Sequence, residues 1–141
     1  MRDDREHGSK PGYVYFLTHG GLTKIGFSVY PYGRLEEFSP SKYPGIVLAH
    51  VIQTNVMRAL ERLIHWHFRE YHVVDADHEG EEWFALPDAM MAQIRLVKSY
   101  RIKPQVLAQI RQGQKPKLPW KQARMRLYWT YRQPRQPPQE G

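Results

Sequence analysis

The chain has 141 residues, and its 21 Lys and Arg against 14 Asp and Glu give a formal net charge of +7. This length accommodates one domain and an extension. The absence of cysteine excludes disulfides and zinc–thiolate sites, and it leaves any metal to carboxylate, His or water ligands, which suit Mg²⁺ or Mn²⁺. No apolar run reaches about 18 residues, and no apolar stretch follows the charged N-terminal residues. We therefore expect no membrane span and no signal peptide, and we expect the protein to be cytoplasmic.

The first elements form a predicted hairpin. Residues 12–17 have the alternating pattern of a short strand, Gly20-Gly21 predicts a two-residue turn, and residues 22–27 form the return strand. This pairing places Tyr15 near Lys24. An aromatic hydroxyl and an ammonium held side by side are groups that a phosphodiester-binding site can use.

A short helix and a third strand are predicted next. Pro31 is tolerated at a helix start, and residues 32–38 can form about two helical turns. Residues 46–53 form a continuous apolar, β-branched run of strand length.

A long helix is predicted over residues 56–71, with Thr54 or Asn55 as its cap. Its apolar residues recur at helical spacing. Glu61 and His65 are four residues apart, so they share one face of this helix.

In the remaining chain, the sequence pattern predicts an acidic loop, a short extended piece over 81–86 and a helix that begins at Pro87-Asp88. A further short helix is expected over 104–112, and the prolines beyond Gly113 argue against compact structure there.

Together these elements predict an α+β domain with a small, three-stranded, mainly antiparallel sheet flanked by helices. We expect a disordered lead over residues 1–11, the domain over 12–98, and a basic extension rich in Pro and aromatic residues over 99–141.

The positive charge belongs to the C-terminal third. Residues 1–94 hold nine basic and thirteen acidic residues, a net charge of −4, whereas 95–141 hold twelve basic residues and one acid, a net charge of +11. Cations interleaved with aromatic rings neutralise phosphates and stack on bases, so we expect a nucleic acid as partner. The other interpretation is a solvated tail that serves solubility or a protein partner. The candidate nucleic-acid-binding residues are Lys117, Lys121, Arg124, Arg126, Trp129 and Arg132.

The order of these elements and motifs resembles that of the GIY-YIG endonuclease superfamily over about residues 12–95. The resemblance is closest to the phage and bacterial branch whose second motif begins with Lys. It rests on Val14-Tyr15-Phe16-Leu17, Lys24-Ile25-Gly26, Arg34, the Glu61 and His65 pair, and Glu82-Trp83-Phe84.

The resemblance implies a metal-dependent DNA endonuclease in a bacterial or phage-infected host cell, with Mg²⁺ or Mn²⁺ held by Glu61. It implies that Arg34 binds the non-bridging phosphate oxygens. Tyr15 is the candidate general base, and for this its pKa must be lowered from about 10. Lys24 is placed to lower it, or to contact the phosphate itself. His65 is either a satisfied core histidine or a contact to phosphate or water.

Two departures from the pattern leave alternatives open. Lys24 replaces the second tyrosine of the superfamily, and Phe38 stands where many relatives carry His or Tyr. Arg34 and Glu61 could also form an ordinary ion pair. The alternative to an endonuclease is therefore a catalytically inactive nucleic-acid-binding or adaptor module on the same fold. An RNA-directed nuclease fits the stacking residues equally well.

Overall fold

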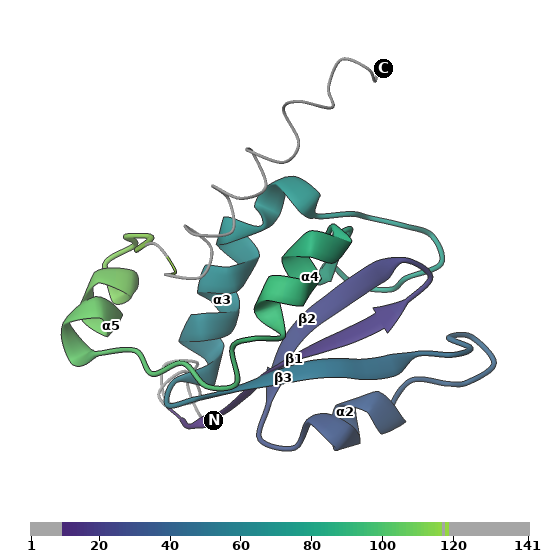
Figure 1. The fold of residues 1–141 in the computed structure, drawn as a ribbon, viewed down its shortest axis with the longest axis horizontal. Coiled ribbons are helices and arrows are strands. Elements are labelled where there is room, and N and C mark those ends of the chain that lie inside the picture. Colours follow the sequence, from purple (N-terminus) through teal and green to yellow (C-terminus); the bar gives the residue numbers. More distant parts are fainter. Residues whose placement is uncertain (1–9, 117, 119–141) are drawn as a thin grey trace, which may run out of the picture.

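The computed structural model of the chain describes residues 10–116 and 118. It confirms the α+β class: a four-stranded antiparallel sheet in the order β3-β1-β2-β4 is flanked by helices (Figure 1). The elements in chain order are β1 (Gly12–His19), β2 (Leu22–Ser28), α2 (Pro31–Glu36), β3 (Val47–Thr54), α3 (Met57–His67), the 3₁₀ turn η1 (Arg69–Tyr71), β4 (Trp83–Phe84), α4 (Asp88–Ile94) and α5 (Pro104–Arg111).

The predicted hairpin is present. Gly20 and Gly21 have φ values of 59° and 80°, which glycine adopts without a steric penalty and which a two-residue turn of this kind needs. The turn pairs Tyr15 with Gly26 and Leu17 with Lys24 across β1 and β2. Directly opposed residues share a face of the sheet, so the Tyr15 and Lys24 side chains start from the same face.

The fourth strand differs from the predicted three-stranded sheet. The short extended piece expected over 81–86 contains β4, which pairs with β2 at Thr23 and Lys24. The Ile25 N–H also donates to the Glu82 carbonyl oxygen at 3.0 Å. This edge carries Glu82 and Trp83 to the return strand of the hairpin.

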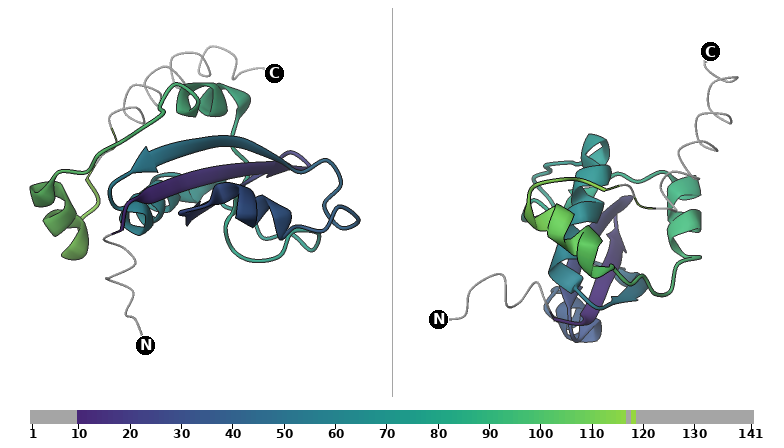
Figure 2. Two further views of the ribbon diagram at one scale, coloured as in Figure 1. Left: turned by 90° about the horizontal axis from the view of Figure 1, so that it is seen from below. Right: turned by 90° about the vertical axis from the view of Figure 1, so that its left-hand side faces the viewer.

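The core lies on the face of the sheet opposite Tyr15. Val14, Phe16, Ile25 and Ile52 alternate with the residues of the other face and are fully buried. They form one apolar cluster with buried side chains of α3 and α4, whereas α2 lies on the other side of the strands (Figures 1 and 2). The α3 residues in the cluster are Leu60, Leu63 and Ile64, and the α4 residues are Met90, Met91 and Ile94.

The predicted helix cap is wrong. Thr54 ends β3, and Val56 precedes the first residue of α3 without a side-chain cap. The Asn55 amide instead exchanges two hydrogen bonds with the backbone of Ile102, at 3.0 and 2.9 Å. A distant segment of the chain therefore uses the side chain that local chemistry would assign to the helix.

The described residues after 98 pack on the domain. Ile102 and Leu118 are buried in the apolar cluster, and His67 Nε2 donates to the Pro116 carbonyl oxygen at 2.8 Å. The expectation of no compact structure beyond Gly113 is therefore wrong for these residues. The Leu118 side chain packs in the core, and the Pro116 carbonyl oxygen accepts a hydrogen bond from α3. The predicted helix near 104–112 is α5.

The expected domain boundary at residue 98 stays a prediction. Residues 1–9, 117 and 119–141 lie outside the described residues, and they include most of the expected lead and all six candidate nucleic-acid-binding residues of the extension. Within the described part of the chain, no helix is long and apolar enough to cross a bilayer.

Candidate active site

Tyr15 lies across its cross-strand partner, Gly26. A Cβ placed on Gly26 would come within 2.4 Å of the Tyr15 hydroxyl oxygen and 2.5 Å of its ring carbon Cζ. Any side chain at position 26 would therefore displace the phenol. This close approach explains why the third position of the Lys24-Ile25-Gly26 motif is a glycine.

A cavity of about 310 Å³ lies beside this pair. Tyr15, Lys24 and Arg34, three of the predicted catalytic residues, line it, so the structure brings together groups from β1, β2 and α2. The remaining lining residues are Gly26, Phe27, Glu37, Phe38 and Glu82.

Both cations of the cavity are paired with carboxylates. Lys24 Nζ lies 2.7 Å from Glu82 Oε1, and Arg34 Nη1 lies 3.3 Å from Glu37 Oε1. The Arg34 side chain is half-exposed, so its pair is a surface pair that contributes little to stability. The described lining is thus charge-balanced, and a phosphate would have to compete with these two carboxylates.

Glu61 and His65 lie on α3 and do not line this cavity. Glu61 is 6% exposed, and its Oε2 lies 3.1 Å from His65 Nε2. The same nitrogen lies 2.7 Å from the Ile25 carbonyl oxygen. Because both neighbours are acceptors, Nε2 carries the hydrogen, and the imidazole joins α3 to the backbone of β2.

His65 therefore has hydrogen-bond acceptors within the protein, and its Nε2 contacts the Glu61 carboxylate. Burial lowers the pKa of His65, but the hydrogen bond to Glu61 and the charge of that carboxylate outweigh it, and the net effect is a pKa above the ordinary value.

The described surroundings of Tyr15 raise its pKa, in contrast to the lowering that a role as general base requires. Burial, followed by the charge of Glu82, raises the pKa of Tyr15 to about 12. Arg34 opposes this rise, whereas Glu61 and Glu37 add to it. Arg34 is the cation that lowers the pKa of the phenol, while the Lys24 ammonium lies 2.7 Å from Glu82 Oε1, so a direct effect of Lys24 on Tyr15 stays a prediction.

The cavity lining includes two carboxylates, the type of ligand that a hard dication binds. No group of three His, Asp or Glu side chains able to hold a metal occurs within the described residues. Mg²⁺, however, keeps several waters and needs only one or two protein carboxylates beside substrate phosphates. Glu61, the predicted ligand, lies outside the lining of the cavity.

Two lining residues are not among the predicted site residues. Glu82 enters the sequence analysis only as part of the Glu82-Trp83-Phe84 motif, and Glu37 is not singled out. The spacing of three between Arg34 and Glu37 on a predicted helix is a local signal for their pair. The Lys24–Glu82 pair spans 58 positions and has no local signal.

Residues 12–101, more than half of the chain, match the model of the T5orf172 domain family. No curated protein and no solved structure matches the chain significantly. The matched range covers the hairpin, the cavity residues and α3. The chain therefore belongs to the T5orf172 domain family, a family of nuclease-type domains.

Proposed function

We propose that the protein is a metal-dependent DNA endonuclease with a GIY-YIG-like site. The observation that carries this proposal is the cavity where Tyr15, Lys24 and Arg34 meet, with Glu61 acting on the same phenol. The three lining residues come from the consecutive elements β1, β2 and α2, and Glu61 comes from α3. Membership of a nuclease-type family agrees with this chemistry.

Arg34 and Lys24 would receive the phosphate. Arg34 is exposed and its guanidinium can bind two phosphate oxygens at once, so an incoming phosphate can replace the weak contact with Glu37. Lys24 is less exposed and its pair with Glu82 is shorter, so we expect it to move less. Both cations would then stabilise the charge that builds on the phosphoryl oxygens.

Glu61 would hold Mg²⁺ or Mn²⁺, and His65 would keep its carboxylate in position from Oε2. When bound, the dication would supply positive charge to neutralise the phosphate and the leaving oxygen. The neutral Tyr15 hydroxyl can donate to, or accept from, a water in the cavity. Its raised pKa means that a role as base requires added positive charge nearby.

The experiment is nicking of supercoiled plasmid with Mg²⁺ or Mn²⁺, comparing Glu61→Gln and Arg34→Ala with matched changes at exposed positions. Glu70→Gln and Arg62→Ala are such controls, because both residues are exposed and lie on η1 and α3 outside the cavity. Metal-dependent nicking that disappears in the site variants and persists in the controls supports the proposal. Equal nicking by all variants refutes it.

One observation favours the second candidate function, a nucleic-acid-binding module that does not cut. Burial and the charge of Glu82 raise the pKa of Tyr15 to about 12, so the candidate general base is not ionised at neutral pH. Intact salt-sensitive DNA binding without nicking in any metal would assign this function.

A further inference from the structure

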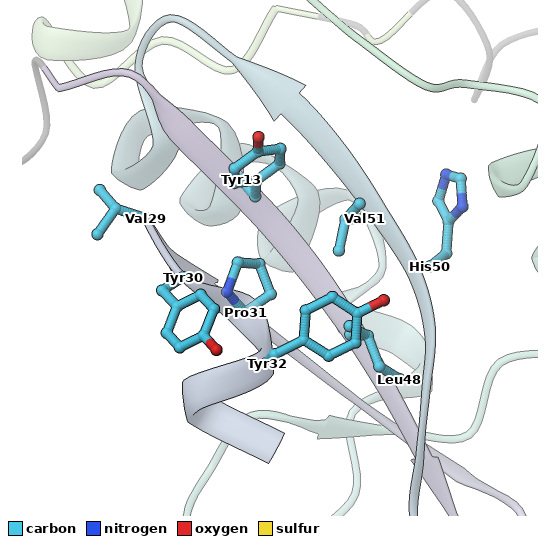
Figure 3. Close-up of a pocket in the computed structure, with 8 residues that line it drawn as sticks. All are labelled: Tyr13, Val29, Tyr30, Pro31, Tyr32, Leu48, His50 and Val51. Atoms are coloured by element: carbon cyan, nitrogen blue, oxygen red, sulfur yellow. The ribbon is translucent and has the colours of Figure 1, made fainter. Parts of the chain in front are cut away.

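A second hollow, with a volume of about 480 Å³, lies between α2 and strands β1 and β3 (Figure 3). Tyr13, Tyr30 and Tyr32 line it together with Val29, Leu48 and Val51. We call this hollow the tyrosine groove. None of the described residues that line it is Lys, Arg, Asp or Glu. Pro31 and His50 complete the lining, which therefore suits a flat, partly apolar group.

The apolar side chains of the groove face solvent. Val29 is 63% exposed, Tyr30 59% and Tyr32 60%, although tyrosine and valine normally bury most of their surface. Exposed apolar side chains that gather at one place mark a binding surface more often than isolated ones do. The groove is large enough for a ligand of one or two aromatic rings.

The Tyr30 ring lies against the first turn of α2. Its backbone N–H donates to Ser28 Oγ at 2.9 Å. A Cβ on Gly33 would come within 2.8 Å of Tyr30 Cδ2, so the ring lies against the backbone of α2. Glycine is unfavourable inside a helix, and here its lack of a side chain makes room for this ring. The Tyr30 side chain thus has the backbone of α2 on one side, and its exposed surface is available to a flat partner.

The tyrosine groove adjoins the candidate active site through two elements. The helix α2 carries Tyr32 in the groove and Arg34 in the cavity, and β1 carries Tyr13 in the groove and Tyr15 in the cavity. Alternate residues of a strand lie on one face, about 7 Å apart. A nucleic acid strand with a phosphate at Arg34 therefore has a neighbouring base within reach of the groove.

We infer that the tyrosine groove stacks an unpaired nucleobase beside the phosphodiester bound in the cavity. This inference rests on the proposed function and names its substrate class: nucleic acid with a single-stranded or locally unpaired segment. A base inside a duplex is stacked on its neighbours and cannot lie on a protein ring, whereas an unpaired base can. The linings of the two hollows agree with this inference. The aromatic and apolar side chains of the groove suit a base, and the cations of the cavity suit a phosphate.

The test measures binding of the full chain, without divalent metal, to two labelled DNAs: a blunt duplex, and the same duplex with a bulge of unpaired bases. The measured quantity is the ratio of the two affinities, in which binding by basic residues far from the groove cancels. Wild type should prefer the bulged DNA. Replacing both Tyr30 and Tyr32 by Ala should lower the ratio roughly ten-fold or more, since removal of an aromatic stacking partner has effects of that order.

Three further variants separate stacking from other effects. Tyr32→Phe keeps the ring and should keep the ratio. Gly33→Ala removes no tyrosine, but it displaces the Tyr30 ring and should lower the ratio. Leu96→Ala, at a side chain that is 73% exposed and lies outside the groove, is the control and should change nothing. A ratio unchanged by the Tyr30 and Tyr32 replacements overturns the inference, as does an equal weakening for both DNAs.

The two proposals fail in different ways. If wild type cuts DNA with Mg²⁺ while the groove variants keep the affinity ratio, the endonuclease stands and the groove is not a base-binding site. If the groove variants lower the ratio but wild type cuts neither DNA in any metal, the groove stands as the binding surface of a module that does not cut.

Discussion

The Tyr15 phenol lies over the backbone of Gly26, its partner across the hairpin, at a distance that leaves no room for a Cβ. Strand alternation puts both residues on one face, and the absence of a side chain at position 26 lets the ring extend across β2. There the charges of Glu82 and Glu61 raise the pKa of its hydroxyl, and the charge of Arg34 lowers it. One glycine thus determines where a candidate catalytic hydroxyl lies.

Replacing Gly26 by Ala should destabilise the protein by about 1–3 kcal/mol, as overpacking of a filled site generally does, and should reduce nicking by displacing the Tyr15 hydroxyl. Urea denaturation measures the stability. In a Tyr15→Ala background the same replacement should cost much less, because the clash has gone. Additive free energies in this double-mutant cycle would contradict the proposed contact.

The hairpin and α3 could be predicted because their signals are local. The Gly20-Gly21 pair fits a turn that requires positive φ values, and Glu61 and His65 share a face by helical spacing. The order of the motifs singled out Tyr15, Lys24 and Arg34, which the fold gathers around one cavity. These are the properties that short-range sequence patterns encode.

The partners of these residues could not be predicted, because they are tertiary. Lys24 meets Glu82 only after β4 joins the edge of β2. Burial of the phenol, followed by the charge of Glu82, raises the Tyr15 pKa that the sequence pattern expected to be lowered. Asn55 likewise bonds to Ile102 rather than to the helix that follows it. In each case the hydrogen-bonding partner of the side chain lies in a distant segment, which a local sequence pattern does not reveal.

Replacing Glu61 by Gln should lower the pKa of His65. Burial, which disfavours the imidazolium, remains in this variant, whereas the carboxylate charge that outweighs it is removed. Titration of the imidazole resonances by NMR measures the change, with Glu70→Gln as a control on an exposed carboxylate. An unchanged His65 titration in Glu61→Gln would contradict the geometry.

The same pair has a consequence for stability. Since the folded-state pKa of His65 is raised, its contribution to stability is fully present below about pH 6.5, the ordinary value, and is lost as the pH rises through the folded-state value. Glu61→Gln should therefore destabilise the protein more at acidic pH than at alkaline pH. Denaturation curves for both proteins at the two pH values test this sign.

Replacing Glu82 by Gln should lower the pKa of Tyr15 from about 12, since the charge of Glu82 is the second cause of the rise after burial. It should also release Lys24 and tighten DNA binding. Phenolate absorbance during alkaline titration, read as the difference from Tyr15→Phe, follows this one group. Glu81→Gln, at the exposed neighbouring position, should leave both properties unchanged. Weaker DNA binding by Glu82→Gln would show that Lys24 needs its partner.

Neutral Tyr15 also makes stability depend on alkaline pH. Its folded-state pKa of about 12 lies above the ordinary value near 10, so its contribution is complete below pH 10 and disappears between pH 10 and 12. Wild type should lose more stability across that interval than Tyr15→Phe, as urea denaturation at the two ends of it would measure.

Leu118 should be a stability residue, although it lies among the basic residues of the extension. Its side chain is fully buried in the apolar cluster, so Leu118→Ala should cost about 2–5 kcal/mol. Leu96→Ala removes the same atoms at a site that is 73% exposed, and it should change stability by no more than about 0.5 kcal/mol. Equal effects of the two changes, by thermal or urea denaturation, would place Leu118 outside the core.

Shortening the chain after Leu118 should separate DNA affinity from the fold. The deleted residues 119–141 hold five Lys and Arg and a single acid, Glu140, whereas the buried Leu118 side chain and the His67–Pro116 hydrogen bond are retained. A cut after Gly113 would remove both and confound the result. We therefore expect the shortened protein to keep its unfolding transition while binding duplex DNA more weakly.

The salt dependence of binding tells how much of the affinity these five cations supply. When a protein makes one phosphate interaction fewer on duplex DNA, the slope of log affinity against log salt becomes shallower by about 0.9. The shortened protein should therefore show a shallower slope than the full chain, as fluorescence anisotropy across a series of salt concentrations would measure. An unchanged slope would mean that cations within residues 1–118, and not the five beyond Leu118, supply the electrostatic part of the affinity.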